Sequence, residues 1–431
     1  MSQSKSTSHQ KTRSWAPAFF TIWTGQAVSL LGSQMVQFAL IWWLTKSTGS
    51  ATVLTTASLV GILPRVILGP FVGALVDRWN RRKIMIFADA GIAAATLLLA
   101  YLFSIGQAKI WAIYVILFVR ALGSGFHSPA MTSSTSLMVP DQHLTRIQGL
   151  NQTLQNGLNI VSAPLGALLL EFLSVGGVLY IDVFSALFAI VPLFFILIPQ
   201  PENGSLSQEK RLVRSVWIDF RQGLRYVMGW PGLRFILIMA MFINMVVTPA
   251  FALLPLLVKD HLGGGALQLG WVNSTFGVGA VAGGLLLSVW GGFKRKIATS
   301  QMGLIGLALG MAVIGLAPQG ALTAAIIGVS VVGLTLPLAN GPITAVIQSV
   351  VEPEVQGRVF TLVGSLAALM SPLGLIAAGP LSDLVSIQIW YLVGAVINLG
   401  FGLGGLASTA LMTIEEQSQP GPKKQPAREP I

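Results

Sequence analysis

The chain has 431 residues, of which 53% are hydrophobic and 10% are charged, and its formal net charge is +11. Soluble domains carry roughly 25% charged residues, so this composition excludes an ordinary water-soluble globular protein. The sequence contains no cysteine, which excludes disulfides, thiolate metal sites and thiol nucleophiles.

Apolar runs recur along the whole chain. About 20 apolar residues, rising about 1.5 Å each, cross a bilayer core of about 30 Å. Twelve runs predict membrane spans, at about 17–44, 51–76, 84–106, 110–135, 148–172, 176–199, 233–258, 267–291, 297–318, 321–348, 358–382 and 387–411. The first is too long for a signal peptide. The predicted fold is therefore an all-α integral membrane protein, with twelve transmembrane helices in two pseudo-symmetric six-helix halves.

Lysine and arginine gather in alternate loops. Most of the 26 basic residues fall at the two ends of the chain and in every second loop between spans. Because basic loops stay on the cytoplasmic side, this pattern predicts that both termini are cytoplasmic. It also accounts for the positive charge without a nucleic-acid partner.

The largest polar interval divides the spans into six and six. The predicted organisation is 1–199, an N-terminal half with a short cytoplasmic N-terminus; 200–232, a cytoplasmic linker; 233–411, a C-terminal half; and 412–431, a disordered cytoplasmic tail. Within the linker, apolar residues at three- and four-residue spacing predict an amphipathic helix at the inner membrane surface, with Arg221 and Arg225 on its polar side. Those apolar residues are Trp217, Phe220, Leu224 and Val227.

The two halves resemble each other at one constant offset. Residues 80–84 correspond to 293–297, Pro129 corresponds to Pro342, and Pro140 corresponds to Pro353. Repeats of six spans are typical of secondary transporters, which hold substrate near the midplane between the repeats.

The stretch GALVDRWNRRK, residues 73–83, sits between the second and third spans. It resembles the signature loop of the major facilitator superfamily, Gly-x-Leu-Ala-Asp-Arg-x-Gly-Arg-Arg, through Gly73, Leu75, Asp77, Arg78, Arg81 and Arg82. Asn80 replaces the second glycine, and asparagine tolerates left-handed backbone. The segments LPRVILGPFVGALVDRWNRRK and WIDFRQGLRYV are similar to the macrolide-efflux branch of drug:proton antiporters, which is related to siderophore exporters. This resemblance implies a bacterial cytoplasmic (inner) membrane.

Asp77 is the single acid among the cations of this loop. A carboxylate at the end of a span can pair with Arg78 or with the N-terminus of a helix from the other half. The resemblance implies that such a contact closes the inner gate, whereas the plainer interpretation is a solvated turn. Arg81 and Arg82 are interpreted mainly as topology-setting cations.

Arg65 and Arg120 are predicted to lie deep within spans. Ionisable groups at this depth mark a transport pathway or a buried pair that locks helices together, and both interpretations stay open. Arg120 resembles the family's fourth-helix arginine, which is associated with proton transfer. The amides Gln26, Gln34 and Asn156 either line a polar cavity or join helices.

A proton antiporter needs a carboxyl group within its bundle that can be protonated. The candidates are Asp182, which we favour, Glu171, Asp89 and, at an outer end, Asp383; each has the alternative of an interfacial group or an arginine partner. His127, two turns from Arg120, is interpreted as structural, and no metal site is expected. Pro164 and Gly166 in the fifth span are expected to serve helix packing.

These features predict a secondary active transporter that exports hydrophobic or amphipathic small molecules, such as macrolide-like drugs, by alternating access with proton antiport. Its partners are the substrate, protons and the bilayer; the proton gradient replaces a cofactor, and we expect a monomer. An enzyme is not expected, and no nucleotide-binding G-x-x-x-x-G-K-[ST] loop occurs. Alternatives are export of an anionic metabolite such as a catecholate siderophore, for which Arg65 and Arg120 supply charge complementarity, and a lipid-handling carrier.

Overall fold

The computed structural model describes residues 15–200 and 220–416, except for the side chains of Pro70, Ala74 and Asp77. This part of the chain is helical and contains no strand. The first half consists of α1 (Trp15–Thr48), α2 (Ala51–Arg78), α3 (Arg81–Ser104), α4 (Ile110–Met138), α5 (Asp141–Phe172) and α6 (Val175–Phe195). The second consists of α8 (Pro231–Leu256), which continues as the π-helix η2 (Leu257–His261), then α9 (Ala266–Trp290), α10 (Lys296–Gly315), α11 (Leu322–Val350), α12 (Pro353–Leu384), α13 (Ile387–Ala407) and the short α14 (Thr409–Met412).

Eleven helices in the described ranges are long and apolar enough to cross a membrane. The predicted span that does not qualify belongs to α5, whose first half carries the polar stretch from Asn151 to Asn159. This helix is nevertheless 32 residues long, and it packs between α1 and α9. The bundle thus supplies protein contacts for a helix that is too polar for lipid alone.

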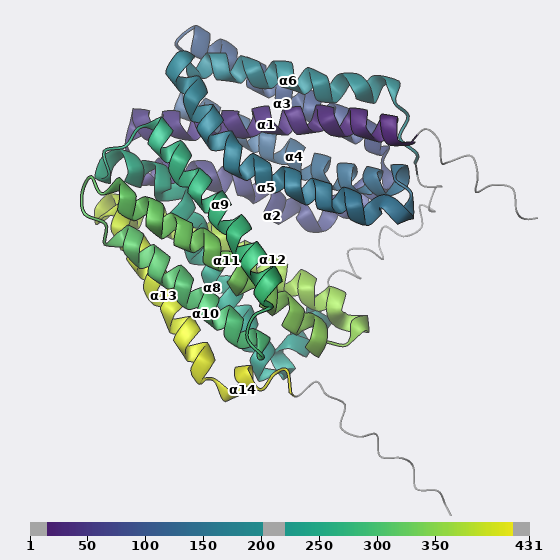
Figure 1. The fold of residues 1–431 in the computed structure, drawn as a ribbon. Helices are drawn as coiled ribbons and strands as arrows, with labels where there is room; N and C mark the ends of the chain where they lie inside the picture. Colours follow the sequence, from purple (N-terminus) through teal and green to yellow (C-terminus); the bar gives the residue numbers. More distant parts are fainter. Residues whose placement is uncertain (1–14, 201–219, 417–431) are drawn as a thin grey trace, which may run out of the picture.

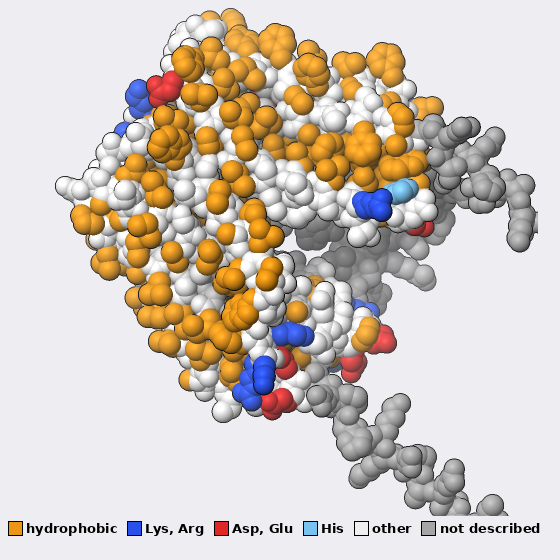
Figure 2. All heavy atoms as spheres, in the orientation of Figure 1, with side chains coloured by type: hydrophobic (Ala, Val, Ile, Leu, Met, Phe, Trp, Pro, Cys, Tyr) orange, Lys and Arg blue, Asp and Glu red, His pale blue; other side chains and the backbone are white. Residues whose placement is uncertain are grey.

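Figure 1 shows two separate bundles, α1–α6 above and α8–α14 below, as the internal repeat predicts. Inside the first bundle, α1 packs on α6, α3 on α4 and α6, and α2 on α4. Between the bundles, the main contacts join α2 with α12 and α5 with α9. Figure 2 shows hydrophobic side chains over most of the visible face and charged ones near its two ends, as expected for a membrane-spanning protein.

The two ends of the molecule differ in how closely the halves approach. We call the end with the turns at 49–50 and 385–386 the outer end, and the end with the turn at 79–80 the inner end, after the charge pattern. Toward the outer end, a Cβ on Gly379 of α12 would lie 2.8 Å from the Thr52 Cα of α2. The halves meet along two seams, one between α2 and α12 and one between α5 and α9. On the second seam, a Cβ on Gly270 of α9 would lie 3.0 Å from the Pro164 Cα of α5. Figure 2 shows a hollow between the halves on the right, toward the inner end. The halves are therefore closed at the end named outer and open at the end named inner.

The turn between α2 and α3 corrects one expectation from the sequence. Asn80 has φ −64°, so it is not left-handed; instead it is the N-cap of α3. Its Oδ1 accepts a hydrogen bond of 3.1 Å from the backbone N–H of Lys83. Asparagine therefore suits this position because it satisfies a free amide at the helix start.

The linker and the C-terminal end both pack on the second half. Residues 220–229 are helical, with Arg221 and Arg225 exposed and Val227 buried, while Trp217 lies outside the described residues. Near the other end, Ile414 is fully buried and packs against Gly232. Ile414, in the segment that follows α14, thus packs on the second half.

Candidate functional site

Three helices of the first half carry polar side chains at matching seven-residue intervals. Seven residues are about two turns, or roughly 10.5 Å, so each pair shares one helix face. Because α4 runs opposite to α1 and α3, the pairs meet at two levels. We call these levels the outer polar layer (Ser33, Thr96, Arg120 and Asp182) and the inner polar layer (Gln26, Asp89 and His127).

The outer polar layer is built around an ion pair between α4 and α6. Arg120 Nη1 lies 2.5 Å from Asp182 Oδ2, and the two side chains are only 9% and 3% exposed. The same nitrogen donates to Thr96 Oγ1 at 2.6 Å, and Nη2 donates to the Ser33 carbonyl at 3.1 Å. The guanidinium of Arg120 is therefore held by three other helices.

The Asp182 carboxylate has a further donor besides the arginine. Its Oδ1 accepts a hydrogen bond of 2.9 Å from the Ser33 hydroxyl of α1. A buried ion pair is tolerated when such additional bonds offset the desolvation of both charges. The outer polar layer thus has one arginine and one acid, whose charges balance, and it joins α1, α3, α4 and α6. Both of the sequence-derived interpretations of Arg120, as a helix lock and as a pathway residue, fit this arrangement.

The inner polar layer contains a second buried carboxylate. Gln26 Nε2 donates to Asp89 Oδ2 at 2.9 Å, and His127 Nε2 lies 3.4 Å from Asp89 Oδ1. Asp89, His127 and Gln26 are all buried. Within the described residues, His127 Nε2 has no well-aligned hydrogen-bond partner. Asp89 thus faces an imidazole ring, and Gln26 binds that carboxylate rather than lining an open cavity.

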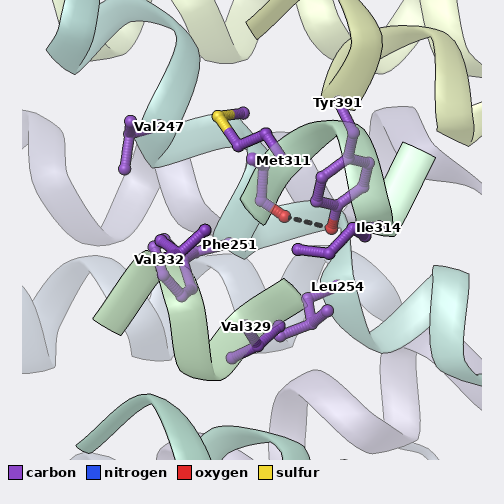
Figure 3. A pocket seen from close by; sticks show the side chains of 9 residues that line it. Val247, Phe251, Leu254, Met311, Ile314, Val329, Val332 and Tyr391 are labelled. Carbon is purple, nitrogen blue, oxygen red and sulfur yellow. Dashed lines mark hydrogen bonds between the residues drawn. The ribbon is translucent and has the colours of Figure 1, made fainter. Parts of the chain in front are cut away.

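The second half has apolar residues at the positions that correspond to the outer polar layer. The repeat offset relates Ser33 to Val246, Arg120 to Gly333 and Asp182 to Ala395. Figure 3 shows a small cavity beside these positions, with a volume of ≈ 20 Å³ and lined by Val247, Ala250, Phe251, Leu254, Met311, Ile314, Val329, Val332 and Tyr391. The Tyr391 hydroxyl donates to the Ala250 carbonyl at 2.6 Å. The buried charges at these related positions therefore belong to the first half.

Arg65 differs from Arg120 in its surroundings. It is exposed on α2, and its Nη2 donates to Ser124 Oγ of α4 at 2.5 Å. It lines a hollow of ≈ 260 Å³ between these two helices, together with residues such as Leu68, Phe126 and Ser128. Among the described side chains, no carboxylate forms an ion pair with it. Arg65 is therefore not locked to an acid.

The signature loop ties the inner ends of the first half together. Arg81 is buried and donates from Nη1 to the Ser133 carbonyl of α4 at 3.2 Å. Arg82 donates from Nη2 to the Phe194 carbonyl of α6 at 2.6 Å and from Nε to the Leu193 carbonyl. Carbonyls near helix C-termini favour cations, so these arginines have a structural role in addition to topology.

The other residues of this loop are less informative. Gly73 and Arg78 are exposed. The side chain of Asp77 lies outside the described part, so its gating role stays a prediction.

The remaining predicted site residues form no hydrogen bond or ion pair with the members of either polar layer, as far as the described residues show. Glu171 is exposed near the outer end of α5, and Gln34 is half-buried. Asn156 accepts a hydrogen bond of 3.1 Å from Gln152 one turn earlier. The helix-packing residues both lie at contacts: Pro164 faces Gly270 of α9, and Gly166 packs on Met35 and Phe38 of α1.

Comparison with known proteins identifies the family. The family model described as Major Facilitator Superfamily matches residues 22–375. The chain belongs to the major facilitator superfamily. It is therefore a multi-pass membrane transporter.

Several superfamily relatives are efflux proteins. The chain is 34% identical over 388 residues to Macrolide efflux protein A of Streptococcus pyogenes, covering 90% of this chain and 95% of that protein. It is 33% identical over 327 residues to Macrolide efflux protein A of Enterococcus faecalis, covering 76% and 100%. It is 26% identical over 402 residues to Multidrug efflux pump Tap of Mycolicibacterium fortuitum, covering 90% and 95%.

Solved structures of other transporters share the fold. Nucleoside transporter NupG superposes with a TM-score of 0.66 at 12% identity, covering 90% of this chain and 98% of that chain. A POT family transporter superposes with a TM-score of 0.69 at 10% identity, covering 91% and 95%. These likenesses concern architecture alone.

Three residues of the polar layers were not predicted from the sequence. Ser33 and Thr96 went unnoticed, and His127 was interpreted as a structural residue without a partner. The matched seven-residue intervals would have indicated them. If α3 and α4 are antiparallel and Asp89 lies beside His127, then Thr96, seven residues after Asp89, lies beside Arg120, seven residues before His127. Comparing polar positions between neighbouring spans is the signal that was missed.

Proposed function

We propose that this superfamily member exports hydrophobic or amphipathic macrolide-like drugs from the cytoplasm, as a monomer in the bacterial inner membrane with both termini cytoplasmic. The observation that carries the proposal is the similarity to two macrolide efflux proteins along most of the chain. The arrangement of the halves supports it, since a structure open at the inner end can take up a cytoplasmic drug. Alternating access then moves the opening to the outer end.

Proton antiport is the second part of the proposal, and Asp182 is the carboxylate that we assign to it. In the ionised state, Asp182 holds Arg120 and, through it, contacts α1 and α3. Protonation neutralises the acid and weakens the ion pair, so the four helices can repack as the halves rock. Asp89, one level closer to the inner end, is a second candidate because it faces His127. Glu171 is exposed, so we assign it no coupling role.

Drug accumulation in cells tests the export function. A drug-sensitive host that expresses the wild-type protein is expected to accumulate less labelled macrolide and to grow at higher macrolide concentrations than the empty-vector strain. The Asp182→Asn variant is expected to lose both effects at equal membrane abundance. The matched control is Asp260→Asn, which changes an exposed acid that pairs with its neighbour Lys259 and is expected to behave as wild type. Equal accumulation with and without the wild-type protein would rule out macrolide export.

Arg65 supports the second candidate function, export of an anionic metabolite such as a catecholate siderophore. An exposed guanidinium that has no acidic partner among the described side chains, in a hollow of ≈ 260 Å³, suits an anionic group of a substrate. The same panel of cells, challenged with a catecholate siderophore in place of the macrolide, separates the two functions. Export of the siderophore alone would favour the second.

A further inference from the structure

Helices α2 and α12 form one of the two seams between the halves, and they run antiparallel. Each helix carries an aspartate one residue before its end: Asp77 precedes Arg78 in α2, and Asp383 precedes Leu384 in α12. Because the helices are antiparallel, each aspartate lies at the level of the other helix's N-terminus. At the outer end this pairing is directly visible.

Asp383 binds the first turn of α2 across the seam. Its Oδ1 accepts a hydrogen bond of 2.7 Å from the Ala51 backbone N–H. Its Oδ2 accepts bonds of 3.0 Å from both the Thr52 backbone N–H and the Ser50 hydroxyl. The first amides of a helix have no partner within the helix, and the positive end of its dipole favours an anion. One carboxylate from the second half thus caps a helix of the first.

The packing beneath this cap leaves no space between the helices. A Cβ on Gly379 would lie 2.8 Å from the Thr52 Cα and 2.3 Å from the Thr55 hydroxyl. Gly379 is one turn before Asp383, so cap and close contact occupy adjacent turns of α12. The seam is therefore sealed at the outer end both by hydrogen bonds and by direct backbone contact.

Two other helix N-termini at the seams, those of α12 and α9, are arranged differently in the described part of the chain. At the inner end, the N-cap residue of α12, Glu352, makes no side-chain capping bond. On the second seam, the N-terminus of α9 is capped within its own chain segment, where Gly265 N–H donates to Gln268 Oε1 at 2.9 Å. Among the described residues, a carboxylate cap across the seam is thus found where the halves are closed.

We propose that Asp383 is a positioning residue that holds the outer gate shut. Opening the outer end separates α12 from α2 and breaks the three bonds of Asp383. The carboxylate therefore stabilises the state in which the inner end is open, and it delays exit of a bound molecule until the halves rock. It is the outer counterpart of the inner gating role that the family resemblance implies for Asp77.

Distance measurements between spin labels test this role without any substrate or proton gradient. The chain has no cysteine, so labels attach only at introduced sites. Lys46→Cys with Leu384→Cys reports the outer end, and Lys83→Cys with Glu354→Cys reports the inner end; all four positions are exposed. In the wild type, we expect short outer and long inner distances to predominate.

Asp383→Asn is expected to shift the ratio of outer-open to outer-closed molecules about fivefold, the usual effect of losing one helix cap. Asp383→Glu keeps a carboxylate and is expected to restore most of the wild-type distribution. Asp260→Asn, another exposed acid near the outer end, is the matched control and is expected to change nothing.

Two results would overturn the proposal: unchanged distances in Asp383→Asn, or the same shift in Asp383→Glu as in Asp383→Asn. If Asp383→Asn does not fold, Ser50→Ala removes one donor to the carboxylate, and unchanged distances in that variant also overturn the proposal. Because the readout is conformational, a failure to export macrolides with intact distance shifts counts against the proposed function alone.

Discussion

Arg120 and Asp182 approach to 2.5 Å in the interior of the first half, although 62 residues separate them in the chain. Both residues stood out in the sequence as ionisable groups within apolar spans, yet no spacing rule connects them. The structure makes them one unit with Ser33 and Thr96. Much of the expected behaviour of this transporter follows from that unit.

Removing one member of the pair is expected to destabilise the protein. Asp182→Asn leaves Arg120 buried without its counter-charge, and Arg120→Gln leaves Asp182 buried without its counter-charge. Each change is expected to lower the free energy of unfolding by about 3–5 kcal/mol. The double variant contains no unpaired charge. Its loss of stability is expected to be smaller than the sum of the losses in the two single variants. Thermal unfolding in one detergent measures all three variants. Additive losses would show that the two side chains do not act as a pair.

The inner polar layer predicts that the ring of His127 supports the buried carboxylate of Asp89. His127→Leu replaces the ring, whose Nε2 lies 3.4 Å from Asp89 Oδ1, with an apolar side chain. Because a buried polar group that loses a polar neighbour is destabilised, the free energy of unfolding of this variant is expected to fall by about 1–3 kcal/mol. The control is His143→Leu, which changes a histidine outside the two layers at the start of α5. Thermal unfolding of His127→Leu at the wild-type temperature would contradict this role.

Arg65 is expected to affect substrates according to their charge. Arg65→Gln removes the cation from the hollow between α2 and α4 but keeps a donor for Ser124. Export of an anionic compound should fall by about tenfold or more, since a charge-assisted hydrogen bond contributes roughly 1.5–3 kcal/mol. Export of an uncharged amphipathic compound should change little. Equal losses for both classes would assign Arg65 a structural role instead.

The outer seam is expected to be intolerant of added volume at Gly379. Gly379→Ala places a methyl group about where Thr52 and Thr55 now lie, so the outer end should fail to close fully. Labels at the outer end should then report longer distances, and drug uptake from the cytoplasmic side should slow. Gly400→Ala is the matched control, because its methyl group would meet nothing within 4 Å. A normal outer distance in Gly379→Ala would mean that the seam can adjust.

Different parts of the molecule were predictable from the sequence to different degrees. The two halves and most spans follow from long apolar runs and basic loops, since the bilayer imposes both. The membrane span of α5 illustrates the limit of hydropathy, because contacts with α1 and α9 accommodate its amides. The candidate site was predicted as single residues: Asp182 and Arg120 were named, but their pairing depends on how α4 and α6 meet, and that is decided by packing.

The asymmetry between the halves was also beyond sequence reasoning. The repeat offset predicts that the two halves have related folds. It does not predict that the first half has buried charges where the second half has a small apolar cavity at the related positions. Likewise, Asp383 was predicted only as an acid at the outer end of a span, and its contact with the Ala51 N–H was not predicted. Contacts between distant helix ends carry no local signal in the chain.

Macrolide transport in proteoliposomes with an imposed pH gradient tests the central claim most directly. With the protein oriented so that the gradient drives protons opposite to the drug, we expect uptake of labelled macrolide by the wild type that stops when the gradient is collapsed. The Asp182→Asn variant should show only gradient-independent exchange, and Asp260→Asn should match the wild type. Macrolide transport by the wild type at the same rate with and without the gradient would contradict proton-coupled export.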